Sequence, residues 1–120
     1  MNYLSAVFLL SAVAAAVLCG CCRRSKISLP EKDFILIDVR TPSEFAGGHL
    51  RGAVNIPHDV IAEKIQTAAP DKNTALYLYC RSGRRVEAAR ESLKKLDYKK
   101  TYNLGGLTQA AETLKLPVEK

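Results

Sequence analysis

Short apolar runs alternate with amphipathic stretches beyond residue 32, and this alternation predicts strands that alternate with helices. One apolar run ends at Asp38, and the run that most strongly predicts a strand ends at Cys80. Both are continuously apolar, which is typical of strands buried on both faces of a parallel sheet. The predicted strands are 34–37, 53–56, 75–79 and 101–104. Because strands joined by helices pair in parallel through right-handed crossovers, we expect an α/β fold with a small parallel sheet flanked by helices.

The stretches between the predicted strands carry signals for helix starts and ends. Thr41 as N-cap, Pro42 at the first helical position and Glu44 closing a capping box predict a short helix. Gly47-Gly48 would end it. Further helices are expected from 59 to the turn at 70–71, over the stretch with Val86, Ala89, Leu93 and Leu96 on one face, and from 107 through Leu114.

A segment without any charged side chain, Tyr3 to Cys22, precedes the predicted domain. Its 20 residues are enough to cross a hydrocarbon core of about 30 Å as a helix. We therefore expect three parts: a signal, lipoprotein or membrane-anchor segment (1–22), a linker (23–32) and a folded domain (33–120).

Three interpretations of segment 1–22 stay open. A cleaved secretory signal usually starts with a basic residue, which this segment lacks. Positions 18–21 (LCGC) are similar to a bacterial lipoprotein signal, cleaved before Cys21 and lipidated on it, which predicts a tethered periplasmic domain. An inner-membrane anchor is the alternative, because the basic flank at 23–26 (RRSK) would then keep the domain in the cytoplasm.

Composition and charge narrow the function classes. With 48% hydrophobic and 25% charged residues, the chain has the composition of a globular protein and not of a disordered one. Residues 1–26 carry three basic residues and no acidic one, so they supply half of the net charge of +6. Because that charge lies beside the membrane-like segment, we expect a bacterial membrane as a partner of this segment and no nucleic acid.

The strongest predicted strand leads into a basic loop that contains a glycine, Cys80 to Arg85 (CRSGRR). Ligands of open parallel sheets bind beyond the carboxyl ends of the strands, where the next helix presents N–H groups that lower the pKa of a thiol. Gly83 allows several N–H groups to converge on an anion, while Arg81 and Arg84 add positive charge with Arg85. We therefore predict a thiolate nucleophile and a small anionic substrate; a buried structural cysteine is the alternative.

The other titratable residues give weaker indications of a functional role. Cys80 is the single cysteine of the predicted domain, and His49 and His58 are isolated, so we expect no disulfide, metal or cofactor. Asp38 and Arg40 follow a neighbouring strand and lie at the same edge of the sheet as the loop. Asp38 is a candidate partner for an arginine of the loop, with stabilisation of its own turn as the alternative.

Three motifs, in this order, resemble those of the rhodanese family. Residues 38–45 (DVRTPSEF) and 48–57 (GHLRGAVNIP) resemble the opening of a rhodanese domain. Residues 80–85 look like its active-site loop, and 103–106 (NLGG) like its late glycine motif. The resemblance runs from about Phe34 to Leu107, and it departs from the family at 108–110, where many rhodaneses carry a Trp.

The resemblance implies a single-domain, rhodanese-like sulfurtransferase without a cofactor. Cys80 would attack the outer sulfur of thiosulfate, release sulfite and hold the sulfur as a persulfide for cyanide or a thiol. Asp38 and Arg40 would support the loop. The residues that the resemblance assigns to substrate binding are Arg81, Ser82, Gly83, Arg84 and Arg85.

Two other functions stay open. Cysteine phosphatases and arsenate reductases of this fold have one more residue between cysteine and arginine than the four between Cys80 and Arg85, and the shorter loop suits a single sulfur atom. A non-catalytic module that binds anions or proteins typically lacks the cysteine. The expected partners are a small anionic sulfur donor and a thiol or thioredoxin-like acceptor, and we expect a monomer.

Overall fold

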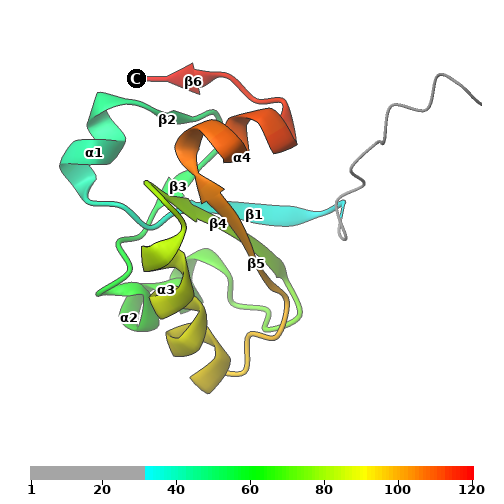
Figure 1. Cartoon of the computed structure of the whole chain (residues 1–120). Coiled ribbons are helices and arrows are strands. Elements are labelled where there is room, and N and C mark those ends of the chain that lie inside the picture. Colours follow the sequence, from blue (N-terminus) through cyan, green and yellow to red (C-terminus); the bar gives the residue numbers. More distant parts are fainter. Residues whose placement is uncertain (1–31) are drawn as a thin grey trace, which may run out of the picture.

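A computed structural model of the chain describes residues 32–120 and contains a parallel sheet of four strands in the order β3-β1-β4-β5 (Figure 1). The central strands are the two long apolar runs, β1 (Phe34–Asp38) and β4 (Ala75–Cys80). The edge strands are β3 (Val54–Asn55) and β5 (Thr101–Gly106). The predicted α/β fold is confirmed.

Helices cover both faces of this sheet. α2 (Ile61–Ala68) and α3 (Arg84–Lys95) pack on one face, and α4 (Leu107–Leu114) packs on the other (Figure 1). The short α1 (Pro42–Gly47) begins with the predicted capping box, in which Thr41 Oγ1 accepts from Glu44 N at 3.3 Å. The start of α1 therefore lies where the sequence predicted it.

Alternating side chains of β4 divide the core between the two faces. Leu76, Leu78 and Cys80 join α2 and α3 in one apolar cluster, whereas Tyr77 and Tyr79 join α4 in the other. All of them are buried, which explains why the sequence of this strand is continuously apolar. The carboxyl end of β4 brings Cys80 to the edge of the sheet where α3 begins.

A second sheet, antiparallel and made of two strands, has no counterpart in the sequence prediction. β2 (His49–Leu50) pairs with β6 (Val118–Glu119), and strands of two residues are too short to show an alternating pattern. Leu50 N donates to Tyr79 Oη at 3.1 Å, which links this sheet to the central one. As a result, β6 lies beside the end of α1, near the carboxyl edge of the main sheet (Figure 1).

The predicted membrane segment lies outside the described residues, and so does Cys21. Within residues 32–120, none of the helices has the length and apolar character needed to cross a membrane. The three interpretations of segment 1–22 stay predictions.

Candidate active site

Cys80 lies where β4 meets the N-terminus of α3, and its side chain is fully buried. Residues 81–83 connect the strand to the helix, and Gly83 turns the backbone with a φ of +90°. A left-handed conformation is readily accessible to glycine, which has no Cβ, and here it directs the Gly83 N–H to Cys80 Sγ at 2.9 Å. The sequence predicted Cys80, Gly83 and the start of a helix as parts of one site. The structure places all three together at the carboxyl end of β4.

The surroundings of Cys80 favour its thiolate. Burial raises the pKa of the thiol, because it disfavours the charged form, and it is the largest single influence. Four backbone N–H groups oppose it, those of Ser82, Val86, Gly83 and Arg85. Together they hold the pKa of Cys80 below its ordinary value. These donors are backbone dipoles at the start of a helix, so they stabilise negative charge on sulfur without a bound cation.

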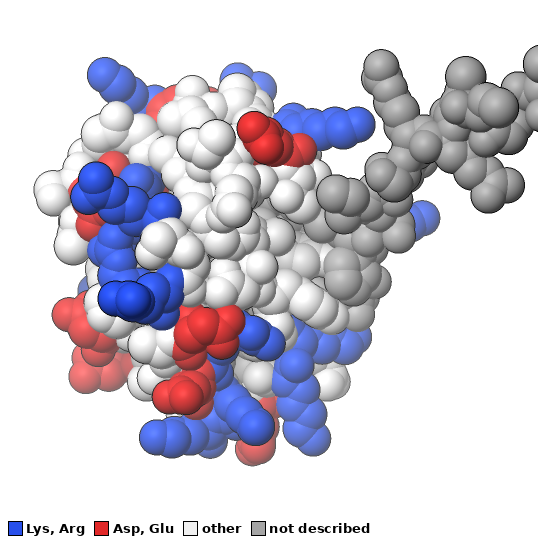
Figure 2. Space-filling view, in the orientation of Figure 1, with Lys and Arg blue, Asp and Glu red and all other residues white. Residues whose placement is uncertain are grey.

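The three arginines of the loop differ in their surroundings. Arg85 Nη1 and Nη2 donate to the two carboxylate oxygens of Glu44 at 2.8 and 3.1 Å, and this bidentate pair lowers the pKa of Glu44 to about 2. Arg81 and Arg84 are exposed and make no side-chain hydrogen bond or ion pair within residues 32–120. Figure 2 shows basic side chains gathered on the surface between α1 and the start of α3. Two of the loop arginines are therefore available to an anion.

Asp38 and Arg40 form a buried ion pair after β1. Arg40 Nη2 lies 2.7 Å from Asp38 Oδ2 and also donates to Gly48 O at 2.6 Å. Hydrogen bonding to Asp38 raises the pKa of Arg40. Of the two roles left open for Asp38, the structure shows stabilisation of its own turn and not a hydrogen bond to an arginine of the loop, because the turn after β1 places the backbone N–H and the guanidinium of Arg40 against this carboxylate. The pair holds the end of β1 to Gly48, the C-cap of α1.

Asn103, on β5, connects this strand to the active-site loop. Its Nδ2 donates to Gly83 O at 3.0 Å and to Glu87 Oε1 at 2.8 Å, and its Oδ1 accepts from Gly105 N at 2.8 Å. Asn103 therefore holds Gly83, the residue whose N–H donates to Cys80 Sγ. Sequence reasoning assigned no role to Asn103, although its place two residues before Gly105-Gly106 was a signal.

The glycines after Asn103 allow β5 and the loop to approach closely. A Cβ on Gly106 would lie 2.5 Å from Arg81 O, and a Cβ on Gly83 would lie 3.2 Å from Gly105 Cα. Cys80 and Gly106 are also register partners in the two neighbouring strands. The late glycine motif thus serves the loop around Cys80, which is far from it in the sequence.

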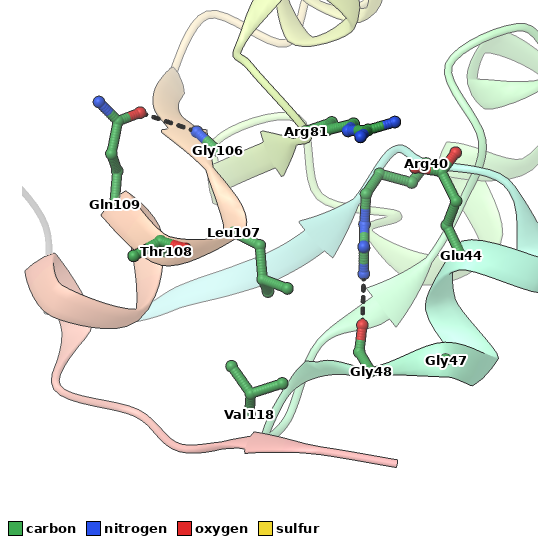
Figure 3. Close-up of a pocket in the computed structure, with 10 residues that line it drawn as sticks. All are labelled: Arg40, Glu44, Gly47, Gly48, Arg81, Gly106, Leu107, Thr108, Gln109 and Val118. Carbon is green, nitrogen blue, oxygen red and sulfur yellow. Dashed lines mark hydrogen bonds between the residues drawn. The ribbon is translucent and has the colours of Figure 1, made fainter.

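A cavity of about 590 Å³ adjoins the loop, within the range of small-molecule sites (Figure 3). Arg81, Arg40 and Glu44 lie on one side of it. Leu107 at the start of α4 and Val118 of β6 point toward one another across the other side. The cavity therefore has a charged wall next to the loop and an apolar wall on its other side.

His49 is held in place by contacts with Phe45. His49 Nδ1 lies 2.8 Å from Phe45 O, and the two rings stack with centroids 3.7 Å apart. Within residues 32–120, no three His, Cys, Asp or Glu side chains are grouped so that they could hold a metal ion.

Comparison with known proteins identifies the family. The family model of the rhodanese-like domain matches residues 26–112, which include the opening motifs, the loop of Cys80 and the late glycine motif. The chain belongs to the rhodanese family.

Rhodanese relatives resemble the chain in sequence and in fold. Thiosulfate sulfurtransferase PspE of Escherichia coli (strain K12) is 43% identical over 75 residues, 62% of this chain and 72% of that protein. A sulfurtransferase of Allochromatium vinosum is 33% identical over 75 residues, 62% of this chain and 68% of that one. A solved structure of a rhodanese with anions from E. coli has a TM-score of 0.64 and 38% identity, covering 72% of this chain and 96% of that one. The resemblance to the rhodanese family that the sequence motifs indicated is confirmed.

The role of Asn103 in this rhodanese can be tested through the thiol that it affects indirectly. In Asn103→Ala, Gly83 loses its support from β5, so its N–H is less well held on Cys80 Sγ and the pKa of Cys80 rises. We expect the midpoint of the pH profile for alkylation of Cys80 by iodoacetamide to rise by roughly one unit. Asn73→Ala, in an exposed turn, is the matched control. A profile that coincides with that of the wild type in a folded N103A variant would contradict this role.

The Glu44–Arg85 pair predicts a pH dependence of stability. The pKa of Glu44 is about 2 in the folded protein against an ordinary 4.5, so its stabilisation is present above about pH 4.5 and is lost as the pH falls toward 2. We expect Glu44→Gln to lower the free energy of unfolding by up to ~1 kcal/mol near pH 7, with the difference shrinking toward pH 2. Urea unfolding measures this, with Glu91→Gln on the exposed face of α3 as control. A difference that does not change with pH would show that the loss has another cause.

Proposed function

We propose that this protein is a sulfurtransferase that moves a sulfane sulfur from thiosulfate through a Cys80 persulfide to a thiophilic acceptor. The observation that carries the proposal is the buried Cys80 sulfur, surrounded by backbone N–H groups at the start of α3. Membership of the rhodanese family and the 43% identity to thiosulfate sulfurtransferase PspE support it.

The first half of the proposed cycle loads the sulfur. The thiolate of Cys80 attacks the outer sulfur of thiosulfate, a new S–S bond forms, and the S–S bond of thiosulfate breaks. Its electron pair leaves with sulfite. The backbone donors of the loop stabilise negative charge on the sulfur atoms, and the unpaired Arg81 and Arg84 attract the dianion. The solved rhodanese from E. coli is described with anions, which supports an anionic ligand for this protein.

The second half discharges the persulfide. Cyanide or a thiolate attacks the outer sulfur, and the S–S bond of the persulfide breaks. Its electron pair returns to Cys80 Sγ, where the same backbone donors receive the charge. No group has to move between the two half-reactions, because the loop is built to hold an anionic sulfur in both.

A direct assay tests the proposed activity. We expect the full-length protein to form thiocyanate from thiosulfate and cyanide, and to release one sulfite per Cys80 when cyanide is left out. Cys80→Ser should reduce thiocyanate formation to the uncatalysed level, since a hydroxyl is a much weaker nucleophile at neutral pH, whereas Ser92→Ala on the surface of α3 should not. No activity above the C80S variant would exclude a sulfurtransferase, and hydrolysis of p-nitrophenyl phosphate in its place would indicate a phosphatase.

We further propose that segment 1–22 tethers the domain to a bacterial membrane through a lipid on Cys21, with the domain in the periplasm. The LCGC sequence at 18–21 supports this proposal. Radiolabelled palmitate should be incorporated by the wild type and by Cys22→Ala but not by Cys21→Ala. Labelling of the C21A variant, or a fused reporter that is active only in the cytoplasm, would favour the uncleaved anchor.

A further inference from the structure

The cavity beside the loop is larger than the reagents of the proposed cycle require. Its volume of about 590 Å³ lies within the range of sites that bind small organic molecules. Diatomic cyanide and the compact thiosulfate dianion would leave most of this volume to solvent. A site of this size suits an organic molecule.

Among the described residues 32–120, the charged side chains that line the cavity include one cation without a partner. Arg40 is paired with Asp38, and Glu44 is paired with Arg85, so these side chains are neutralised within the protein. Arg81 lines the same cavity and makes no ion pair or side-chain hydrogen bond within residues 32–120. The charged wall therefore favours an occupant with one anionic group.

The opposite wall is apolar. Leu107 and Val118 face one another across the cavity, and Val118 exposes half of its surface, more than any other large apolar side chain among the described residues (Figure 3). An occupant that covers these side chains gains from burial of apolar surface. Cyanide and thiosulfate have no carbon chain that could make this contact.

The cavity also adjoins the nucleophile. Arg81 directly follows Cys80, and Gly106, another residue of the cavity wall, is the register partner of Cys80 on β5. A molecule held between Arg81 and the apolar wall therefore lies beside the loop that would carry the persulfide.

We propose that this cavity binds the sulfur acceptor, and that the acceptor is a small organic thiol with a carboxylate or similar anionic group. Arg81 pairs with the anionic group, while Leu107 and Val118 cover the carbon chain. The thiolate attacks the outer sulfur of the Cys80 persulfide, the S–S bond breaks, and its electron pair returns to Cys80. The transferred sulfur leaves as the terminal sulfur of an organic persulfide. This inference rests on the proposed persulfide of Cys80.

Thiosulfate and the acceptor thiol use Arg81 in turn. Sulfite leaves after the first displacement, so the charge of Arg81 is free again before the acceptor enters. One cation therefore serves both half-reactions, and the apolar wall selects among acceptors.

Single-turnover discharge of the persulfide tests the proposal. Cys80 of the full-length protein is loaded with sodium tetrasulfide, which makes the measurement independent of thiosulfate as donor. Discharge is then followed with 3-mercaptopropionate, with its methyl ester and with cyanide, and the rates are expressed per thiolate. We expect the carboxylate thiol to react about tenfold faster than the ester, because only the former forms a charge-assisted pair with Arg81.

Three variants assign this preference to the cavity. Arg81→Gln should bring the rates of the two thiols together. Val118→Glu places a carboxylate on the apolar wall and should slow the anionic thiol about tenfold relative to the ester. Val54→Glu is the matched control, because Val54 is also an exposed valine but lies on the edge strand β3, outside this cavity. It should keep the wild-type preference.

Several results would overturn the proposal. These are equal rates for the two thiols in the wild type, a preference that persists in R81Q, or the same effect in V118E and V54E. Discharge by a thioredoxin-like protein at rates that neither small thiol approaches would assign the acceptor to the protein class instead. Failure of thiosulfate alone to load Cys80 would count against the proposed donor, whereas the preference measured after tetrasulfide loading would still support the cavity.

Discussion

The backbone turn at Gly83 is the constraint on which the rest of the site depends. Only residues 81–83 separate the last residue of β4 from the first of α3, and the left-handed Gly83 points its N–H back at Cys80 Sγ. Asn103 binds the carbonyl of Gly83 from the neighbouring strand, and the absence of a side chain at Gly106 lets the two backbones meet. The register of β4 with β5, the late glycine motif and the start of α3 therefore all help to fix the conformation of residues 81–83.

This turn explains why dipoles and not a salt bridge stabilise the sulfur. Arg85, in the first turn of α3, is paired with Glu44 from α1. Backbone N–H groups act on the sulfur instead, and they are held by the helix and by β5 whichever sulfur atom carries the charge. A fixed array of donors needs no rearrangement during a reaction, which is the advantage of a preorganised site.

Local patterns predicted much of this structure, and long-range pairing accounts for what they missed. The capping box at Thr41 and the apolar runs of β1 and β4 depend on neighbours in the sequence, so their elements could be predicted. The ion pair of Arg85 with Glu44 and the hydrogen bond of Asn103 to Gly83 join residues that the sheet topology brings together. The spacing of residues in the sequence does not show such pairs. The sequence of the loop therefore suggested three free positive charges, whereas Arg85 is paired with Glu44 and two exposed arginines remain.

The burial of Cys80 has a consequence for the order of the proposed reaction. The side chain is buried, which favours a slim reagent such as the terminal sulfur of thiosulfate over a bulky one. An added sulfur extends the side chain about 2 Å beyond Sγ, the length of an S–S bond. The acceptor would then meet the outer sulfur first, while the loop shields the inner one. Attack at the inner sulfur would leave Cys80 in a mixed disulfide, so the same enclosure that tunes the thiol also directs the transfer.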